Sequence, residues 1–172
     1  MITTLRSTTL LVAVSVLSAI GCKPAERKTA EVGASVTPPV VLPPFDQEIP
    51  SFKATLTLPG AWKGGYRLVE RADTMFGAFH AAEFHYTADS ARGVPPRLLM
   101  IIRAFKKPAF ETVRASQDGK SKVLAEHDGV VYTYSIVASS PYGPNSAATL
   151  RVDQMMLPLV SEANPLKLTF NK

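Results

Sequence analysis

The chain has 172 residues, of which 46% are apolar and 19% are charged, and its formal net charge is +5 at pH 7. This composition excludes collagen-like, coiled-coil and strongly disordered chains, and a single cysteine excludes the disulfide framework of a small secreted scaffold. The length predicts roughly one globular domain with an appendage.

The first 21 residues have the pattern of a secretory signal peptide. One cation, Arg6, precedes an uncharged, mostly apolar run over residues 10–20. This run is too short to span a membrane, which takes about 20 residues, but it suits the apolar region of a signal peptide. We therefore expect residues 1–21 to be removed during export.

The apolar run ends at the only cysteine of the chain. The sequence Ser18-Ala19-Ile20-Gly21-Cys22 resembles the bacterial lipobox, with Ala19 at the position where Leu is most frequent. The resemblance implies that signal peptidase II recognises Ser18, Ala19, Ile20 and Gly21, cuts before Cys22, and leaves that cysteine carrying acyl chains such as palmitate. The alternative is that Cys22 is an ordinary small residue at the end of a signal peptide or short anchor helix.

Acylation of Cys22 would decide where the protein resides. Each buried methylene contributes about 0.8 kcal/mol, so two or three acyl chains hold a protein stably at a membrane. In the sorting pattern of double-membrane bacteria, an Asp after the cysteine favours retention in the inner membrane. Lys23 occupies that position here, which implies a lipid anchor in the outer membrane, facing the periplasm.

Residues 22–48 differ in composition from the rest of the chain. They hold five prolines, many small residues and no apolar period of a helix or strand. Such a segment cannot bury enough apolar surface to offset the entropy lost on ordering it, so we predict a disordered tether that begins at the lipidated cysteine. The alternative is that Val40, Val41, Leu42 and Phe45 dock onto the domain as a strap.

Residues 49–172 predict a single α+β domain, with a mostly antiparallel sheet and one or two helices packed on it. Apolar residues alternate with polar ones at residues 52–58 and 82–86, which is typical of half-buried strands. Further strands are predicted at 66–71 and 166–170. The continuous apolar run at 98–102 predicts a central strand covered on both faces.

A hairpin and two helices complete the predicted elements. Asp128-Gly129 suits a tight turn between strands at 123–126 and 130–138. A short helix is expected at 108–116, and a second one begins after Ser146 and runs to about residue 157. A strand at 148–153 fits that second segment equally well, and Pro158 should kink or end either element.

The layout of these elements is similar to a known fold family. Residues 52–62 (FKATLTLPGAW) form a strand that ends in Leu-Pro-Gly-x-Trp, and the order of elements over residues 98–170 resembles the PsbP-like α/β/α sandwich. The long helix common in that fold has room here only at 108–116. The resemblance implies a non-enzymatic assembly, binding or accessory protein, although a fold alone does not determine a function.

Three residues form the nearest approach to a metal-binding cluster. Glu83 and His85 should share one face of their strand, while His80 points to the other face, so the three do not converge. We therefore predict no metal site, no cofactor and no catalytic site. The alternative is an envelope hydrolase with a dispersed site that involves Glu83, His85 or His127.

Charge and aromatic residues give the remaining clues to a partner. Arg103, Lys106 and Lys107 are the densest cationic group, and a weak positive field favours anionic lipid headgroups or an acidic envelope protein. Nucleic acid is not expected as a partner of an exported protein. Trp62 and Tyr142 lie beside Pro or Gly in turns and could stack on a ligand, or they could close one end of the core.

These patterns lead to one functional hypothesis. We expect a lipid-anchored bacterial envelope lipoprotein whose periplasmic domain is a non-catalytic binding or accessory module.

Overall fold

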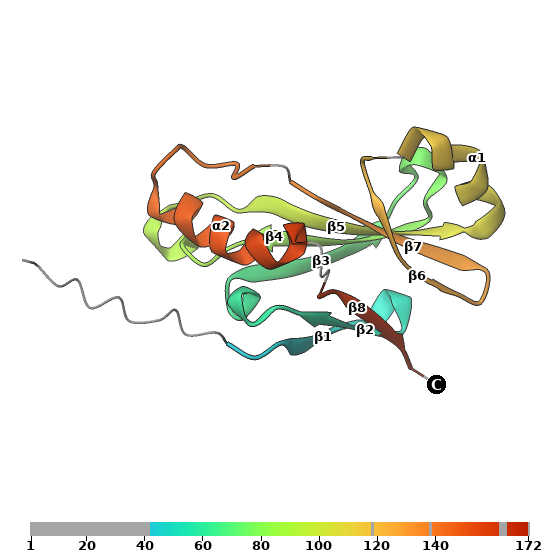
Figure 1. Cartoon of the computed structure of the whole chain (residues 1–172), viewed down its shortest axis with the longest axis horizontal. Coiled ribbons are helices and arrows are strands. Elements are labelled where there is room, and N and C mark those ends of the chain that lie inside the picture. The colour runs from blue at the N-terminus through green and yellow to red at the C-terminus, as the bar shows by residue number, and fades with distance from the viewer. Residues whose placement is uncertain (1–41, 118, 138, 162–164, 172) are drawn as a thin grey trace, which may run out of the picture. The chain divides into compact units, whose positions relative to one another are not determined.

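The computed structural model describes residues 42–117, 119–137, 139–161 and 165–171. The predicted signal peptide, the lipobox with Cys22 and the tether up to residue 41 lie outside these ranges. The described residues form two antiparallel sheets and two α-helices (Figure 1). The predicted fold class, α+β with helices packed on antiparallel sheet, is therefore confirmed.

The elements follow one another along the chain with short connections. The strands are β1 (Phe45–Ile49), β2 (Ala54–Leu58), β3 (Tyr66–Ala72), β4 (His80–Tyr86), β5 (Arg97–Lys106), β6 (Lys122–His127), β7 (Val130–Ile136) and β8 (Lys167–Phe170). The α-helices are α1 (Lys107–Gln117) and α2 (Ala147–Val160). Short 3-10 helices are η1 (Pro50–Phe52), η2 (Gly60–Trp62), η3 (Met75–Gly77) and η4 (Ser90–Arg92).

The smaller sheet has the strand order β1-β2-β8. Its central strand alternates as the sequence predicts, because Ala54, Leu56 and Leu58 are fully buried while the threonines between them are half-buried. Phe52, which was expected to begin this strand, lies in η1 instead. Strand β8 pairs with β2 in antiparallel register, with Leu56 opposite Leu168, which confirms the terminal strand.

Strand β1 corrects the predicted extent of the tether. Residues 45–48 were assigned to a disordered segment, yet they pair with β2 from Phe45 opposite Leu58 onward. The ring of Phe45 stacks on that of Tyr66, with centroids 6.4 Å apart, and the Tyr66 hydroxyl donates to Gln47 Oε1 at 2.7 Å. Cross-strand and side-chain contacts thus order this part of the chain, in agreement with the strap alternative for Phe45.

The larger sheet has the strand order β3-β4-β5-β7-β6. Strand β5 is central, and its residues 99–102 are at most 6% exposed, which confirms a strand covered on both sides. The β6–β7 hairpin is also confirmed. Its turn residues, Asp128 and Gly129, have φ values of 48° and 72°, the positive values that a tight hairpin turn requires.

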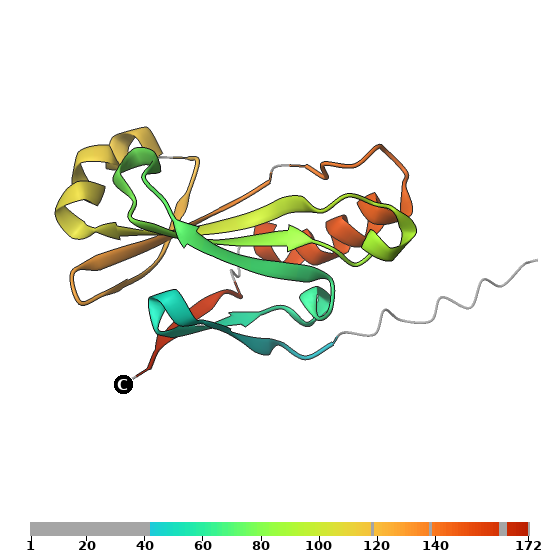
Figure 2. The same cartoon turned by 180° about the vertical axis from the view of Figure 1, so that it is seen from behind.

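The main core lies between one face of the larger sheet, the smaller sheet and α2 (Figure 2). It contains Phe84, Ile102 and Tyr134 from the larger sheet, and Leu56 and Leu168 from the smaller one. Buried residues of α2 complete it: Ala148, Val152, Met155, Met156 and Leu159.

Helix α1 covers one end of the face of the larger sheet that points away from the main core. Successive side chains of a strand point to opposite faces, so β5 and β7 also have apolar side chains on this second face. Phe105 and Val131 point away from the main core and pack with Phe110 of α1 and Ala78. The predicted helix at 108–116 is therefore confirmed.

Helix α2 confirms the second predicted helix and excludes the strand alternative at 148–153. Ser146 Oγ caps it by accepting a hydrogen bond from the Thr149 amide at 3.0 Å. The helix passes Pro158 and ends at Val160, so Pro158 does not end the element, which was one of the two expected outcomes. Pro158 has no N–H, so it removes one intrahelical hydrogen bond two residues before the helix ends.

Candidate functional site

A pocket of about 540 Å³ opens between η2, α2 and the segment that leads into β1. This volume lies within the usual range for small-molecule sites, roughly 300–1,000 Å³. We call it the η2–α2 pocket. Its lining residues come from separate parts of the chain and are Leu42, Pro44, Pro59, Gly60, Ala61, Lys63, Gly64, Gly65, Ala88, Arg151, Gln154, Pro158 and Pro165.

Local structure explains why these residues meet. Pro59 and Gly60 end β2 and start η2, where Trp62 donates its indole N–H to the Met155 carbonyl at 2.7 Å. This bond fixes η2 against α2. The backbone of Leu42 lies directly on Gly60, since a Cβ on that glycine would be 2.3 Å from the Leu42 carbonyl oxygen. A side chain at position 60 would therefore push away one wall of the pocket.

The pocket lining is apolar and basic, without acidic residues. Seven of the lining residues are leucine, proline or alanine, two are the cations Lys63 and Arg151, and none is acidic. The surface thus combines an apolar wall with positive charge at its edge. Such a pocket favours a ligand with an apolar body and an anionic group.

A second pocket, of about 380 Å³, lies next to the first, at the N-terminal end of α2. Tyr142, predicted as a ligand contact, does line it, together with Asp89, Arg92 and Val94. The Tyr142 hydroxyl donates to the Pro95 carbonyl at 2.8 Å.

The buried carboxylate of Asp89 connects the two pockets. Its side chain is 4% exposed and accepts a hydrogen bond from the Tyr86 hydroxyl. Arg151 of the first pocket and Arg92 of the second each lie 3.5 Å from Asp89 Oδ1. Burial, together with the hydrogen bond to Asp89, raises the pKa of Tyr86 to about 12. Tyr86 therefore keeps its proton, and its hydrogen bond to Asp89, to a higher pH than an ordinary tyrosine would.

Trp62 is buried in the core, where no ligand at the surface could stack on it. The side chain has no exposed surface, and its rings pack edge-on against Tyr66 and Phe84 at 5.7 and 6.1 Å. Trp62 therefore agrees with the alternative interpretation, an aromatic side chain that closes one end of the core.

Glu83 and His85 share a face of β4, as predicted, and their side chains are 3.0 Å apart. Burial alone would raise the pKa of Glu83, but hydrogen bonds from His85 and Arg71 outweigh it and lower the pKa. His80 lies on the other face, where its ring meets that of Phe52 at 5.9 Å. Within the described ranges, no group of three or more His, Cys, Asp or Glu residues could hold a metal ion.

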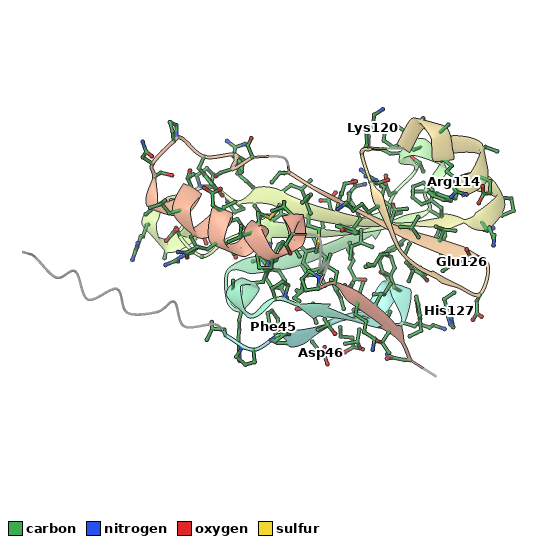
Figure 3. The ribbon with its side chains drawn as sticks, viewed as in Figure 1. Phe45, Asp46, Arg114, Lys120, Glu126 and His127 are labelled. Carbon is green, nitrogen blue, oxygen red and sulfur yellow. The ribbon has the colours of Figure 1, made fainter. Side chains whose placement is uncertain are left out.

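His127 lies far from His85. It is at the end of β6 (Figure 3), stacked on Phe170 with ring centroids 4.1 Å apart. His85 pairs with Leu98 at the start of β5, whereas His127 pairs with Val130, which pairs with Lys106 at the end of β5. Leu98 and Lys106 are about 26 Å apart along a strand. The structure therefore does not bring the predicted hydrolase residues together.

The densest cationic group is divided between two environments. Arg103 pairs with the buried Asp73 at 2.8 Å, and Lys107 pairs with Glu126 across the start of α1. Lys106 lies between them and is exposed. These cations belong to the end of the sheet opposite the η2–α2 pocket.

The sequence reasoning missed Lys63, Arg151 and Gln154 as pocket residues. A signal was present in α2, where residues 151, 154 and 158 follow one helical stripe next to the buried stripe. That spacing gave no information about which other segments face the stripe.

Comparisons with known proteins identify no family for this chain. No protein-family model, curated protein or solved structure matches it. No helix in the described part of the chain has the length and apolar character needed to cross a membrane.

Proposed function

We propose that this chain is a lipid-anchored envelope lipoprotein whose folded domain binds an anionic amphiphile in the η2–α2 pocket without catalysis. The anchor is proposed as acyl chains on Cys22, in the outer membrane and facing the periplasm. The lipobox-like sequence and Lys23 support this location. The PsbP-like resemblance adds the expectation of a binding or accessory role.

The pocket lining carries the proposal for the folded domain. The apolar wall of Leu42, Pro44 and Pro158 favours a hydrocarbon chain, while Lys63 and Arg151 favour a carboxylate or phosphate at the edge. Arg151 also pairs with the buried Asp89 at 3.5 Å, so Lys63 carries most of the preference for an anionic headgroup over a cationic one. A ligand that lacks either the chain or the anion should bind weakly.

Isothermal titration calorimetry with dodecanoate tests this chemistry. The chain from Lys23 onward carries every described residue and no acyl group, and circular dichroism first establishes that it is folded. We expect binding of dodecanoate, with no measurable binding of acetate or of dodecyltrimethylammonium. Lys63→Gln should weaken dodecanoate binding about five-fold, since a partly exposed ion pair contributes about 1 kcal/mol.

A matched pair of helix variants locates the binding. Gln154 lines the pocket, whereas its neighbour Asp153 is exposed and does not line it. Gln154→Phe should fill the pocket and abolish binding, while Asp153→Phe should leave the affinity unchanged. Equal affinity in both variants, or equal binding of the cationic amphiphile, would contradict the proposal.

A further inference from the structure

The connection between β3 and β4 presents a cluster of exposed apolar side chains. Met75, Phe76 and Phe79 are 50%, 50% and 45% exposed, all within residues 75–79, which we call the apolar loop. Large aromatic side chains have areas of 150–250 Å² each, so the exposed apolar area is roughly 300 Å². The largest apolar patch of a typical monomeric protein measures about 300–600 Å² and is often functional, so these side chains reach the lower end of that range.

The apolar loop is held rigidly in this exposed arrangement. The Asp73 carboxylate accepts from the Met75 amide at 3.0 Å, and the Ala78 amide donates to the Met75 carbonyl at 3.1 Å. The Phe79 amide donates to the Ala104 carbonyl of β5 at 3.0 Å. These hydrogen bonds lie within the β3–β4 connection or join it to β5. The exposed apolar side chains therefore belong to an ordered segment.

Phe76 adopts a backbone conformation that favours glycine. Its φ and ψ are 56° and 23°, which is uncommon for a bulky residue and costs of the order of 1–3 kcal/mol. The following residue, Gly77, also has a positive φ, 81°. These two residues turn the chain so that Ala78 is buried against Phe105 while the Phe76 ring stays exposed.

Two arginines lie at the base of the apolar loop, and their acidic partners lie deeper. The Arg71 side chain is 41% exposed, whereas its partners Glu83 and Asp73 are 14% and 1% exposed. The Arg103 guanidinium lies 5.9 Å from the centre of the Phe76 ring.

Helix α1 adds further cations beside the loop. It packs against η3, and Figure 3 shows Arg114 and Lys120 at this end of the molecule. Arg114 is 68% exposed and pairs with Glu111, which is 50% exposed. Lys107 is 50% exposed and pairs with Glu126, which is 48% exposed, and Lys106 at the end of β5 is exposed as well. Among these side chains the exposed cations outnumber the exposed carboxylates, Glu111 and Glu126, so the surface around the apolar loop has a net positive charge.

We propose that the apolar loop inserts into the headgroup region of an anionic bilayer. Aromatic and methionine side chains would enter the interface, while the surrounding cations would meet anionic lipid headgroups. Both described pockets lie at the other end of the larger sheet. The inference therefore goes beyond the proposed ligand site and does not depend on a ligand there.

Tryptophan fluorescence in vesicles tests this contact at the loop itself. The full chain is reconstituted in phosphatidylcholine vesicles, with and without phosphatidylglycerol, using lipids brominated near the glycerol. Trp62 is the only native tryptophan and has no exposed surface, so it supplies a constant background. In Phe76→Trp, we expect a blue shift and bromine quenching of the added emission, both greater with phosphatidylglycerol.

Leu157→Trp is the matched control, because Leu157 is an exposed apolar residue on α2, 68% exposed. Its emission should show neither effect. Met75→Trp provides a second reporter should Phe76→Trp disturb the turn. Absence of quenching at both loop positions overturns the proposal, and so does equal quenching at position 157. Protection of the loop from aqueous quenchers without bromine quenching also overturns it, and would assign the patch to a protein partner or a second copy.

Discussion

The buried carboxylate of Asp73 should be a main source of stability at the α1 end of the larger sheet. Its Oδ2 accepts from Arg103 Nε at 2.8 Å and its Oδ1 accepts from the Met75 amide at 3.0 Å. A hydrogen bond to a charged group contributes about 1.5–3 kcal/mol, and a neutral one about 1 kcal/mol. The Arg71 contact, at 3.6 Å and 41% exposed, adds little.

Two substitutions separate these contributions. Asp73→Ala removes both hydrogen bonds and should lower the free energy of unfolding by about 2–4 kcal/mol. Asp73→Asn keeps an oxygen for the Met75 amide but replaces the oxygen that accepts from Arg103 with an NH2 donor, so we expect the loss of the charged hydrogen bond, about 1.5–3 kcal/mol. Asp46→Asn is the control, since Asp46 is exposed and bonds only Thr57 in the described contacts, and it should change stability by less than about 0.5 kcal/mol.

Urea unfolding at several pH values measures the effect, with the emission of Trp62 as the signal. Burial alone would raise the pKa of Asp73, but the Met75 amide, Arg103 and Arg71 together lower it. The stabilisation is therefore fully present above the unfolded pKa, about 3.9, and is lost as pH falls through the lower folded value. Equal stability of wild type and Asp73→Asn at pH 7 would refute this reasoning, as would a difference between them that grows toward low pH.

Two further substitutions test the packing at either end of the fold. Gly60→Ala should displace Leu42, because the new Cβ would lie 2.3 Å from its carbonyl oxygen; limited proteolysis followed by mass spectrometry should then show faster cleavage before β1. Gly143→Ala meets no atom within 4 Å and should leave the cleavage rate unchanged. Phe110→Ala should lower the free energy of unfolding by about 3 kcal/mol in urea titrations, because Phe110 is 5% exposed and packs on Phe105. A loss below about 1 kcal/mol would mean that α1 is not anchored through this side chain.

Local patterns in the sequence predicted most strands and both helices. The alternation of Leu56 and Leu58 with threonines, the Asp128-Gly129 turn and the Ser146 cap each act within a few residues, and each produced the expected element. Strand β1 was missed because prolines at 43 and 44 dominate the composition just before Phe45. Its order depends on β2 and Tyr66, which no local pattern includes.

Contacts between segments that are distant in the sequence could not be predicted, either for the fold or for the pocket. The sequence could not show that β2 and β8 form a separate sheet, because the register of Leu56 with Leu168 joins distant segments. For the same reason, the η2–α2 pocket could not be predicted from Lys63 and Arg151. Each is an ordinary exposed cation in sequence, and only the docking of η2 on α2 places both at one pocket.

Intact mass and membrane fractionation of wild type beside Cys22→Ala test the central claim, a lipid-anchored envelope protein, most directly. Expressed in a double-membrane bacterium, wild type should lose residues 1–21, gain the mass of its acyl chains and sediment with outer membranes. Cys22→Ala should stay unprocessed or appear in the soluble fraction. If both proteins have the same mass apart from the substitution, carry no acyl chain and fractionate alike, the lipoprotein account is wrong.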